Sequence, residues 1–148
     1  MTGSGDAVEV LSGATDDGLR WVVLASGDDR DLYTLLRVYR GDELLVPGSG
    51  FGGPPLYPGS PLNEWRGRTD KLPYFVMART SPDVERVVAT TDRGVDVELT
   101  LSAPDDRFGL RFAAAALPEG HGPGSIRAER GGDFLGRTGQ PMPQPPRR

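Results

Sequence analysis

The one histidine of the chain, His121, is the side chain best suited to acid–base chemistry at neutral pH, and it lies in a Gly-rich stretch at 120–124. A serine-hydrolase site would place such a base beside a nucleophile on a strained turn, usually in a Gly-x-Ser-x-Gly motif. The chain has no such motif and no cysteine. We therefore predict no catalytic residue and expect His121 to be an exposed loop residue. An enzyme that uses paired carboxylates, such as Glu64 and Asp70, is the lowest-ranked hypothesis.

Acidic turns are the second feature that could carry chemistry, because calcium prefers carboxylate oxygens as ligands. Asp28, Asp29 and Asp31 form the densest of these turns and are the candidate metal ligands. No turn has the spacing of an EF-hand loop, and Asp is also common in turns because its side chain bonds nearby backbone N–H groups. Zinc is not expected from one histidine and no cysteine. The alternative function is thus a calcium or small-ligand site, whose further candidates are Asp16, Asp17, Asp105, Asp106, Arg79, Arg86 and Arg111.

The Gly-rich stretch at 48–53 could cradle a phosphate, but the pattern around it is incomplete. A P-loop continues with Lys-Ser or Lys-Thr and opens a helix, and neither follows here. The glycines are better explained by turns and by close approach of the backbone to a neighbour. No cofactor is therefore predicted.

A long Pro/Gly segment at 47–63 is the most distinctive part of the chain. Loops beyond about 12 to 15 residues are uncommon in compact domains and are often functional. Its prolines stiffen the backbone, which lowers the entropy lost on binding, and its aromatic residues suit an interface. The predicted protein-binding residues are Phe51, Leu56, Tyr57, Leu62 and Trp65. Two other interpretations stay open: the loop covers an open end of the core, or its rings form a platform for a carbohydrate.

The segments that must position these residues have the two-residue periodicity of β-strands. At 95–102, four apolar residues alternate with polar ones, which predicts a strand with one buried face. The segment 32–40 also fits a helical stripe, but its β-branched and aromatic residues favour a strand. The expected strands are 8–11, 19–26, 32–40, 43–46, 73–79, 84–91, 95–102, 108–117, 125–130 and 133–135.

Many short strands with regular turns and no convincing helix predict an all-β fold, an antiparallel β-sandwich, with a small β-barrel as the alternative. We divide the chain into a flexible N-terminus at 1–6, a sandwich domain at 7–136 and a disordered tail at 137–148.

The half of the chain from Pro73 onward resembles small Ig-like β-sandwich domains of uncharacterised actinobacterial proteins. The likeness is in the order of a strand, a Gly turn, an aromatic-rich strand ending in Leu-Pro, and a final hairpin. The segments that carry it are 82–88, Asp92-Arg93-Gly94, 108–118 and 125–130. The resemblance implies the fold and no activity.

Composition limits the partners that we expect. The formal net charge is −4 and no basic stripe is present, so nucleic acid is not an expected partner. The longest apolar run is far shorter than the roughly 20 residues that span a bilayer, and no signal peptide is visible. Lys71 is the only lysine among 17 basic residues, which indicates a GC-rich, actinobacterial genome. We expect a cytoplasmic protein that binds another protein, and its oligomeric state stays open.

Overall fold

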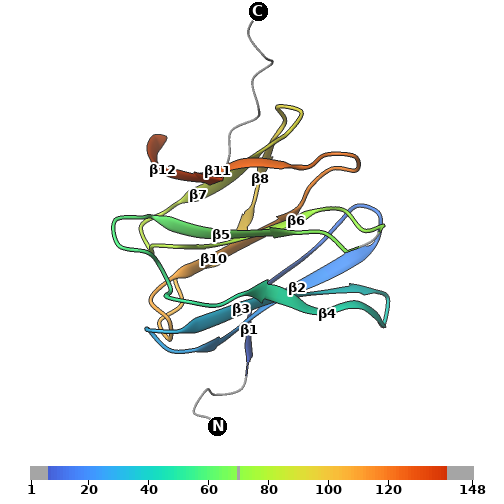
Figure 1. Cartoon of the computed structure of the whole chain (residues 1–148), viewed down its shortest axis with the longest axis horizontal. Helices are drawn as coiled ribbons and strands as arrows, with labels where there is room; N and C mark the ends of the chain where they lie inside the picture. The colour runs from blue at the N-terminus through green and yellow to red at the C-terminus, as the bar shows by residue number, and fades with distance from the viewer. Residues whose placement is uncertain (1–6, 70, 140–148) are drawn as a thin grey trace, which may run out of the picture.

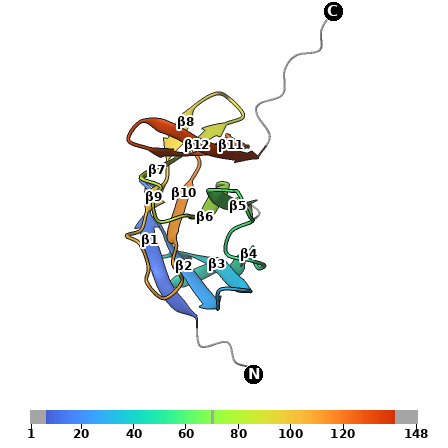
Figure 2. The ribbon, with the colours of Figure 1, turned by 90° about the vertical axis from the view of Figure 1, so that its left-hand side faces the viewer.

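A computed structural model describes residues 7–69 and 71–139, which form three antiparallel sheets of four strands stacked as three layers (Figures 1 and 2). Sheet A is a meander in chain order: β1 (Val8–Ala14), β2 (Leu19–Gly27), β3 (Leu32–Arg40) and β4 (Glu43–Phe51). Sheet B has the order β5 (Leu62–Gly67), β6 (Phe75–Thr80), β10 (Arg111–Ala116) and β9 (Thr100–Leu101). Sheet C has the order β12 (Asp133–Gly139), β11 (Pro123–Arg130), β7 (Arg86–Thr91) and β8 (Asp96–Glu98).

Sheet B is the middle layer and is covered on both faces (Figure 2). Every residue of β6 is buried, and so are the four central residues of β10. Continuous apolar runs of this kind are typical of strands that are buried on both sides. Because side chains alternate along a strand, Phe75 and Met77 pack towards sheet A, whereas Val76 and Ala78 pack towards sheet C. The two apolar cores therefore lie on opposite sides of one sheet.

The predicted all-β antiparallel sandwich is confirmed. Within the described ranges no helix is present, and each sheet keeps two edge strands, so none closes into the alternative barrel. The segment 32–40 is β3 and not a helix. It fits between β2 and β4 with Leu32, Thr34, Leu36 and Val38 buried, and this tertiary pairing decides between its two patterns.

The predicted strands 95–102 and 108–117 have different boundaries in the structure. The segment 95–102 is not one strand: β8 pairs with β7 in sheet C, and β9 pairs with β10 in sheet B. Leu99, 3% exposed, is the crossing point between the layers, while Val95 is 43% exposed in the turn before β8. The apolar residues alternate along the sequence because Val97 faces the core from sheet C and Leu101 faces the same core from sheet B. Similarly, β10 begins only at Arg111, and a turn precedes it.

The long loop is shorter than the sequence suggested, because β4 continues to Phe51 and β5 begins at Leu62. The strand β5 itself was not predicted. At the other end of the domain, β12 runs to Gly139 and includes three residues that the sequence assigned to the tail. The remainder of that predicted tail and the predicted N-terminus at 1–6 lie outside the described residues. No helix in the described part could cross a membrane.

Candidate functional site

The loop at 52–61 joins sheet A to sheet B, and two buried polar side chains fix its backbone from beneath. Asn63, 5% exposed, donates from Nδ2 to the carbonyls of Pro54 and Pro55 at 3.2 and 3.0 Å. Its Oδ1 accepts the backbone N–H of Tyr57 at 3.3 Å. Arg79 donates from Nη2 to the Pro54 carbonyl at 3.0 Å. These bonds hold one side of the loop to the central sheet.

Arg79 is fully buried between sheets A and B, an unusual position for a guanidinium group. Its Nη1 donates to the Leu32 carbonyl at 2.6 Å and to Thr34 Oγ1 at 3.1 Å. The guanidinium carbon lies 4.1 Å from the centre of the Phe51 ring, which adds a cation–π contact. Burial lowers the pKa of Arg79 to about 10, so the group stays charged at neutral pH. No carboxylate within the described ranges forms an ion pair with it.

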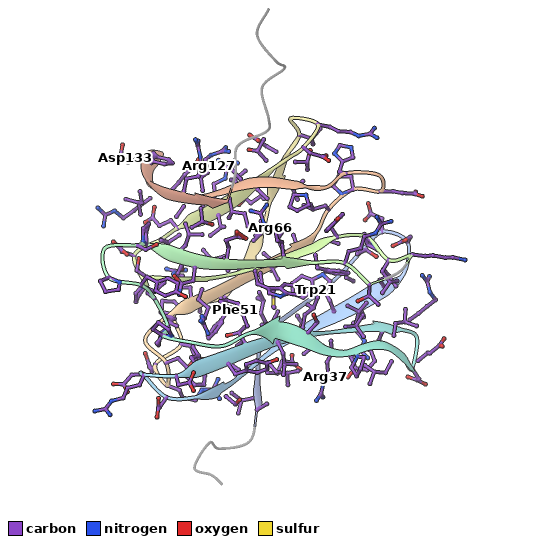
Figure 3. The ribbon with its side chains drawn as sticks, viewed as in Figure 1. Trp21, Arg37, Phe51, Arg66, Arg127 and Asp133 are labelled. Atoms are coloured by element: carbon purple, nitrogen blue, oxygen red, sulfur yellow. The ribbon has the colours of Figure 1, made fainter. Side chains whose placement is uncertain are left out.

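The five residues predicted to bind a protein are not equally accessible. Leu62 is 1% exposed and belongs to the core between sheets B and C, so it is not available to a partner. Phe51 and Trp65 pack partly buried against the core of sheet A, and Figure 3 shows Phe51 between the sheets. Leu56 contacts a third apolar cluster. Tyr57 alone is strongly exposed, at 58%. The loop thus covers the core, as the alternative interpretation expected, and leaves one aromatic ring in solvent.

The acidic turn at 28–31 serves the backbone. Asp28 Oδ1 accepts the N–H groups of Asp31 and Arg30, at 3.0 and 2.9 Å, and these bonds lower the pKa of its carboxyl group. Asp31 Oδ1 accepts the N–H of Gly53 at 3.2 Å, which ties this turn to the loop. Among residues 7–69 and 71–139 no three acidic or histidine side chains form a group that could hold a metal. Asp28 and Asp31 thus use their carboxylates to bond backbone N–H groups of the turn and of the loop.

A cleft of about 930 Å³ lies at the other end of the molecule, where one turn or connection from each sheet meets the others. Its walls include Trp21 of sheet A, Tyr74 before β6 and His121 before β11. Arg68 stacks over Tyr74, with the guanidinium carbon 5.4 Å from the ring centre. Charged groups of both signs line its rim, among them Lys71 and Asp92. The sequence did not indicate this cleft, because its wall segments are far apart along the chain.

His121 has a structural role in this cleft. Its Nδ1 lies 2.9 Å from Thr91 Oγ1, which also accepts the N–H groups of Arg93 and Val95, both at 3.2 Å. Because a hydroxyl oxygen accepts two hydrogen bonds, its own proton is donated to Nδ1. His121 is thus half-buried rather than exposed, and it links the β10–β11 connection to the β7–β8 turn.

The remaining candidates are occupied by local bonds and lie apart. Glu64 accepts from Arg66 at two points, 3.0 and 2.9 Å, and its proposed partner Asp70 lies outside the described residues. Arg86 forms ion pairs on sheet C. Arg111 donates to the carbonyls of Pro82 and Ser102. Arg79, the third predicted arginine, is buried and donates to the Leu32 and Pro54 carbonyls.

Comparison with protein-family models, curated proteins and solved structures found no match to the chain. The functional proposal therefore rests on the geometry of the chain itself.

Proposed function

We propose that the chain is a non-enzymatic protein-binding module that presents the loop at 52–61, with Tyr57 as its principal contact. The observation that carries this proposal is the combination of a fixed backbone and an exposed ring. Asn63 and Arg79 hold the loop carbonyls from inside, while Tyr57 is 58% exposed. An ordered loop loses little conformational entropy on binding, and tyrosine is enriched among the residues that dominate interfaces.

We also infer that residues 62–139 form the Ig-like sandwich that the sequence resemblance implied. The strand order supports this: with β5 to β12 taken as A, B, C, C′, D, E, F and G, sheet B reads A-B-E-D and sheet C reads G-F-C-C′. The loop then enters strand A beside the B–C connection, since Ser81 donates its N–H to the Pro61 carbonyl at 3.0 Å. In antibody variable domains the B–C loop belongs to the binding end of the sandwich.

The proposal includes a protein partner in the cytoplasm and not nucleic acid, the latter on the sequence argument of charge. It is tested by affinity purification from a lysate of the source organism with matched baits. Tyr57→Ala removes the exposed ring of the loop. Phe134→Ala removes an equally exposed ring, 58%, from the edge strand β12 and serves as the control.

We expect the Tyr57→Ala bait to lose a protein that the wild-type and Phe134→Ala baits retain, with unchanged melting temperatures for both variants. A third bait, Asn63→Ala, loosens the loop while it keeps the ring, and should capture less of the same protein. If no captured protein depends on Tyr57, or if Tyr57→Ala and Phe134→Ala lose the same proteins equally, the loop is not the binding site.

A further inference from the structure

The outer face of sheet A, the side turned away from sheet B, carries an unusual combination of apolar and basic side chains. Cross-strand register places Arg20, Val22 and Leu24 of β2 beside Tyr39, Arg37 and Leu35 of β3 on this side. Tyr33 and Leu44 are 44% and 45% exposed, and Figure 3 shows Arg37 below the sheet, away from the other two layers. Val22 is buried, at 7% exposure, whereas Leu24, Leu35 and Tyr39 are half-buried, so part of this apolar surface is open to a partner. We call this set of eight residues the sheet A face.

Its two arginines are available to a partner. The guanidinium carbon of Arg20 lies 4.3 Å from the centre of the Tyr39 ring, so the planar group is held flat against the face. Arg37 donates from Nε to the Pro47 carbonyl at 2.9 Å, and this bond orients its Nη groups. Neither forms an ion pair with a carboxylate of the described residues. Two oriented guanidinium groups are therefore left without counter-charges.

The outer face of sheet C shows how the same protein neutralises arginines that need no partner. There Arg127 pairs with Glu129 at 2.7 Å and with Asp96 at 3.1 Å. Arg86 pairs with Glu129 at 3.2 Å and with Glu98 at 3.1 Å. Every arginine of that cluster thus contacts two carboxylates across neighbouring strands. The two arginines of the sheet A face form no such pairs, and neither does Glu9 on the outer side of β1.

Glycines keep part of the sheet A face uncovered. Gly48 and Gly50 of β4 border Leu35, and Gly52 borders Tyr33. A side chain at Gly50 would collide with the Thr34 carbonyl, 1.9 Å from an added Cβ, so this glycine is required by the pairing of β4 with β3. At Gly48 and Gly52 the nearest atoms to an added Cβ are 3.5 and 3.4 Å away, and a small side chain would fit. Their absence exposes the backbone of β4 beside Leu35 and Tyr33.

The charges around the face complete a pattern. Most acidic residues of sheet A lie in or beside its turns, at 16–17, 28–31 and 42–43, and Glu9 lies on the edge strand β1, whereas the two arginines lie on the central strands β2 and β3. The result is a basic and apolar centre with an acidic rim. A partner that matches it carries carboxylates and apolar side chains at its centre, because charge complementarity selects the opposite pattern.

We propose that the sheet A face docks an acidic, apolar segment of a partner protein, whose carboxylates pair with Arg20 and Arg37 while its apolar side chains cover Tyr33, Leu35 and Leu44. This inference rests on the proposed binding function but uses a different surface from the loop. It gives the partner a chemistry that can be tested directly.

The test uses the full chain and a labelled synthetic peptide in which Glu alternates with Leu, with fluorescence anisotropy as the readout. A second peptide carries Gln in place of Glu. We expect the Glu peptide to bind about tenfold more tightly than the Gln peptide, and to weaken between about 50 and 300 mM NaCl. Equal binding of the two peptides would overturn the proposal, as would the absence of binding at low salt.

Variants locate the binding on the molecule. Arg20→Gln and Arg37→Gln should each weaken the Glu peptide about threefold, as expected for exposed ion pairs. Arg137→Gln is the matched control, because Arg137 also stacks on an exposed ring, 5.3 Å from the centre of Phe134, but on sheet C. If Arg137→Gln weakens binding as much as Arg20→Gln does, the peptide is attracted by basic charge in general and the sheet A face is not its site.

Tyr57→Ala separates the two proposals in the same assay. We expect it to leave the affinity for the Glu peptide unchanged, because the loop is not part of the sheet A face. Loss of the partner protein in the purification with intact peptide binding supports both surfaces. Intact peptide binding without any Tyr57-dependent partner overturns the loop proposal alone, and Tyr57-dependent capture without peptide binding overturns the face proposal alone.

Discussion

Sheets A and C cover opposite faces of the same central sheet, yet they do so with different side chains. Towards sheet A, sheet B presents large groups such as Phe75, Met77 and the buried Arg79. Towards sheet C it presents small ones, among them Ala78 and Ala113. The two layers differ on their outer sides as well, because sheet C carries ion pairs and sheet A carries apolar groups with unpaired arginines. Arg86 and Arg127 of sheet C therefore have carboxylate partners of their own, while Arg20 and Arg37 of sheet A are left available for a partner protein.

The largest change in stability is expected when the buried cation between sheets A and B is removed. Arg79→Ala should destabilise the fold by about 3 kcal/mol or more, because it leaves a cavity and deprives buried acceptors of their donor. Chemical denaturation measures the effect. Arg111→Ala is the control: this arginine lies on the other side of sheet B, half-buried, and also donates to two carbonyls. Equal losses for the two variants would show that burial of Arg79 has no special role.

The packing between sheets B and C can be tested by adding volume instead. Ala113 is fully buried and faces sheet C, while Ala116 on the same strand is half-buried and faces sheet A. Ala113→Val should cost about 1–3 kcal/mol through overpacking, and Ala116→Val less than about 0.5 kcal/mol. Both values come from the same denaturation experiment. A larger loss of stability for Ala116→Val would show that the side of sheet B facing sheet C is not packed more tightly at Ala113 than the opposite side is at Ala116.

The sequence predicted most strands of both outer layers, because periodicity depends on burial of one face. It did not reveal that there are three layers. The run Phe112–Ala115 is apolar on both sides, but one strand does not show which sheets cover it. It also gave no sign that Arg79 is buried, since an arginine in a strand is usually on the surface. Its partners Leu32, Thr34 and Pro54 are distant in the chain, so only the tertiary structure unites them.

The candidate sites were predicted less completely than the fold, for a similar reason. Proline and glycine content indicated that a loop lies within 47–63, and the structure places it at 52–61. Local composition does not distinguish Leu62, which is buried, from Tyr57, which is exposed. The sheet A face had a local signal that the prediction did not use: Tyr33, Leu35, Arg37 and Tyr39 alternate with the buried residues of the same strand. The sequence could not show that Arg20 and Arg37 lack carboxylate partners, because ion pairs between strands depend on the tertiary structure.

A smaller effect is expected where the cleft joins sheet C to sheet B. His121→Ala should destabilise the fold by about 1 kcal/mol, since Thr91 loses the acceptor of its proton. His121→Asn should retain much of that stability, because the amide oxygen can take the place of Nδ1. Thermal melting of both variants measures the difference. If Asn is no better than Ala at this position, the bond to Thr91 does not contribute to stability and the link between these connections lies elsewhere.

The smallest effect concerns the charges on sheet C and has a defined pH dependence. Hydrogen bonds from Arg127 lower the pKa of Glu129, and bonds from Thr90 and then Arg127 lower the pKa of Asp96. Carboxylates with a lowered pKa in the folded state stabilise the fold above their unfolded values, near pH 4, and lose this contribution as the pH falls through the folded values. Glu129→Gln should therefore melt slightly below wild type at neutral pH, and the gap should close below about pH 4.

Sheet A provides the control for this pH series. Glu9 lies on β1 opposite Leu24, on the outer side of sheet A, and forms no ion pair within the described part of the chain. Glu9→Gln should thus leave the melting temperature unchanged at both ends of the series. A pH-dependent gap for Glu9→Gln, equal to that for Glu129→Gln, would mean that the two outer faces do not differ electrostatically. Sheet A would then offer an acidic partner no binding surface that sheet C lacks.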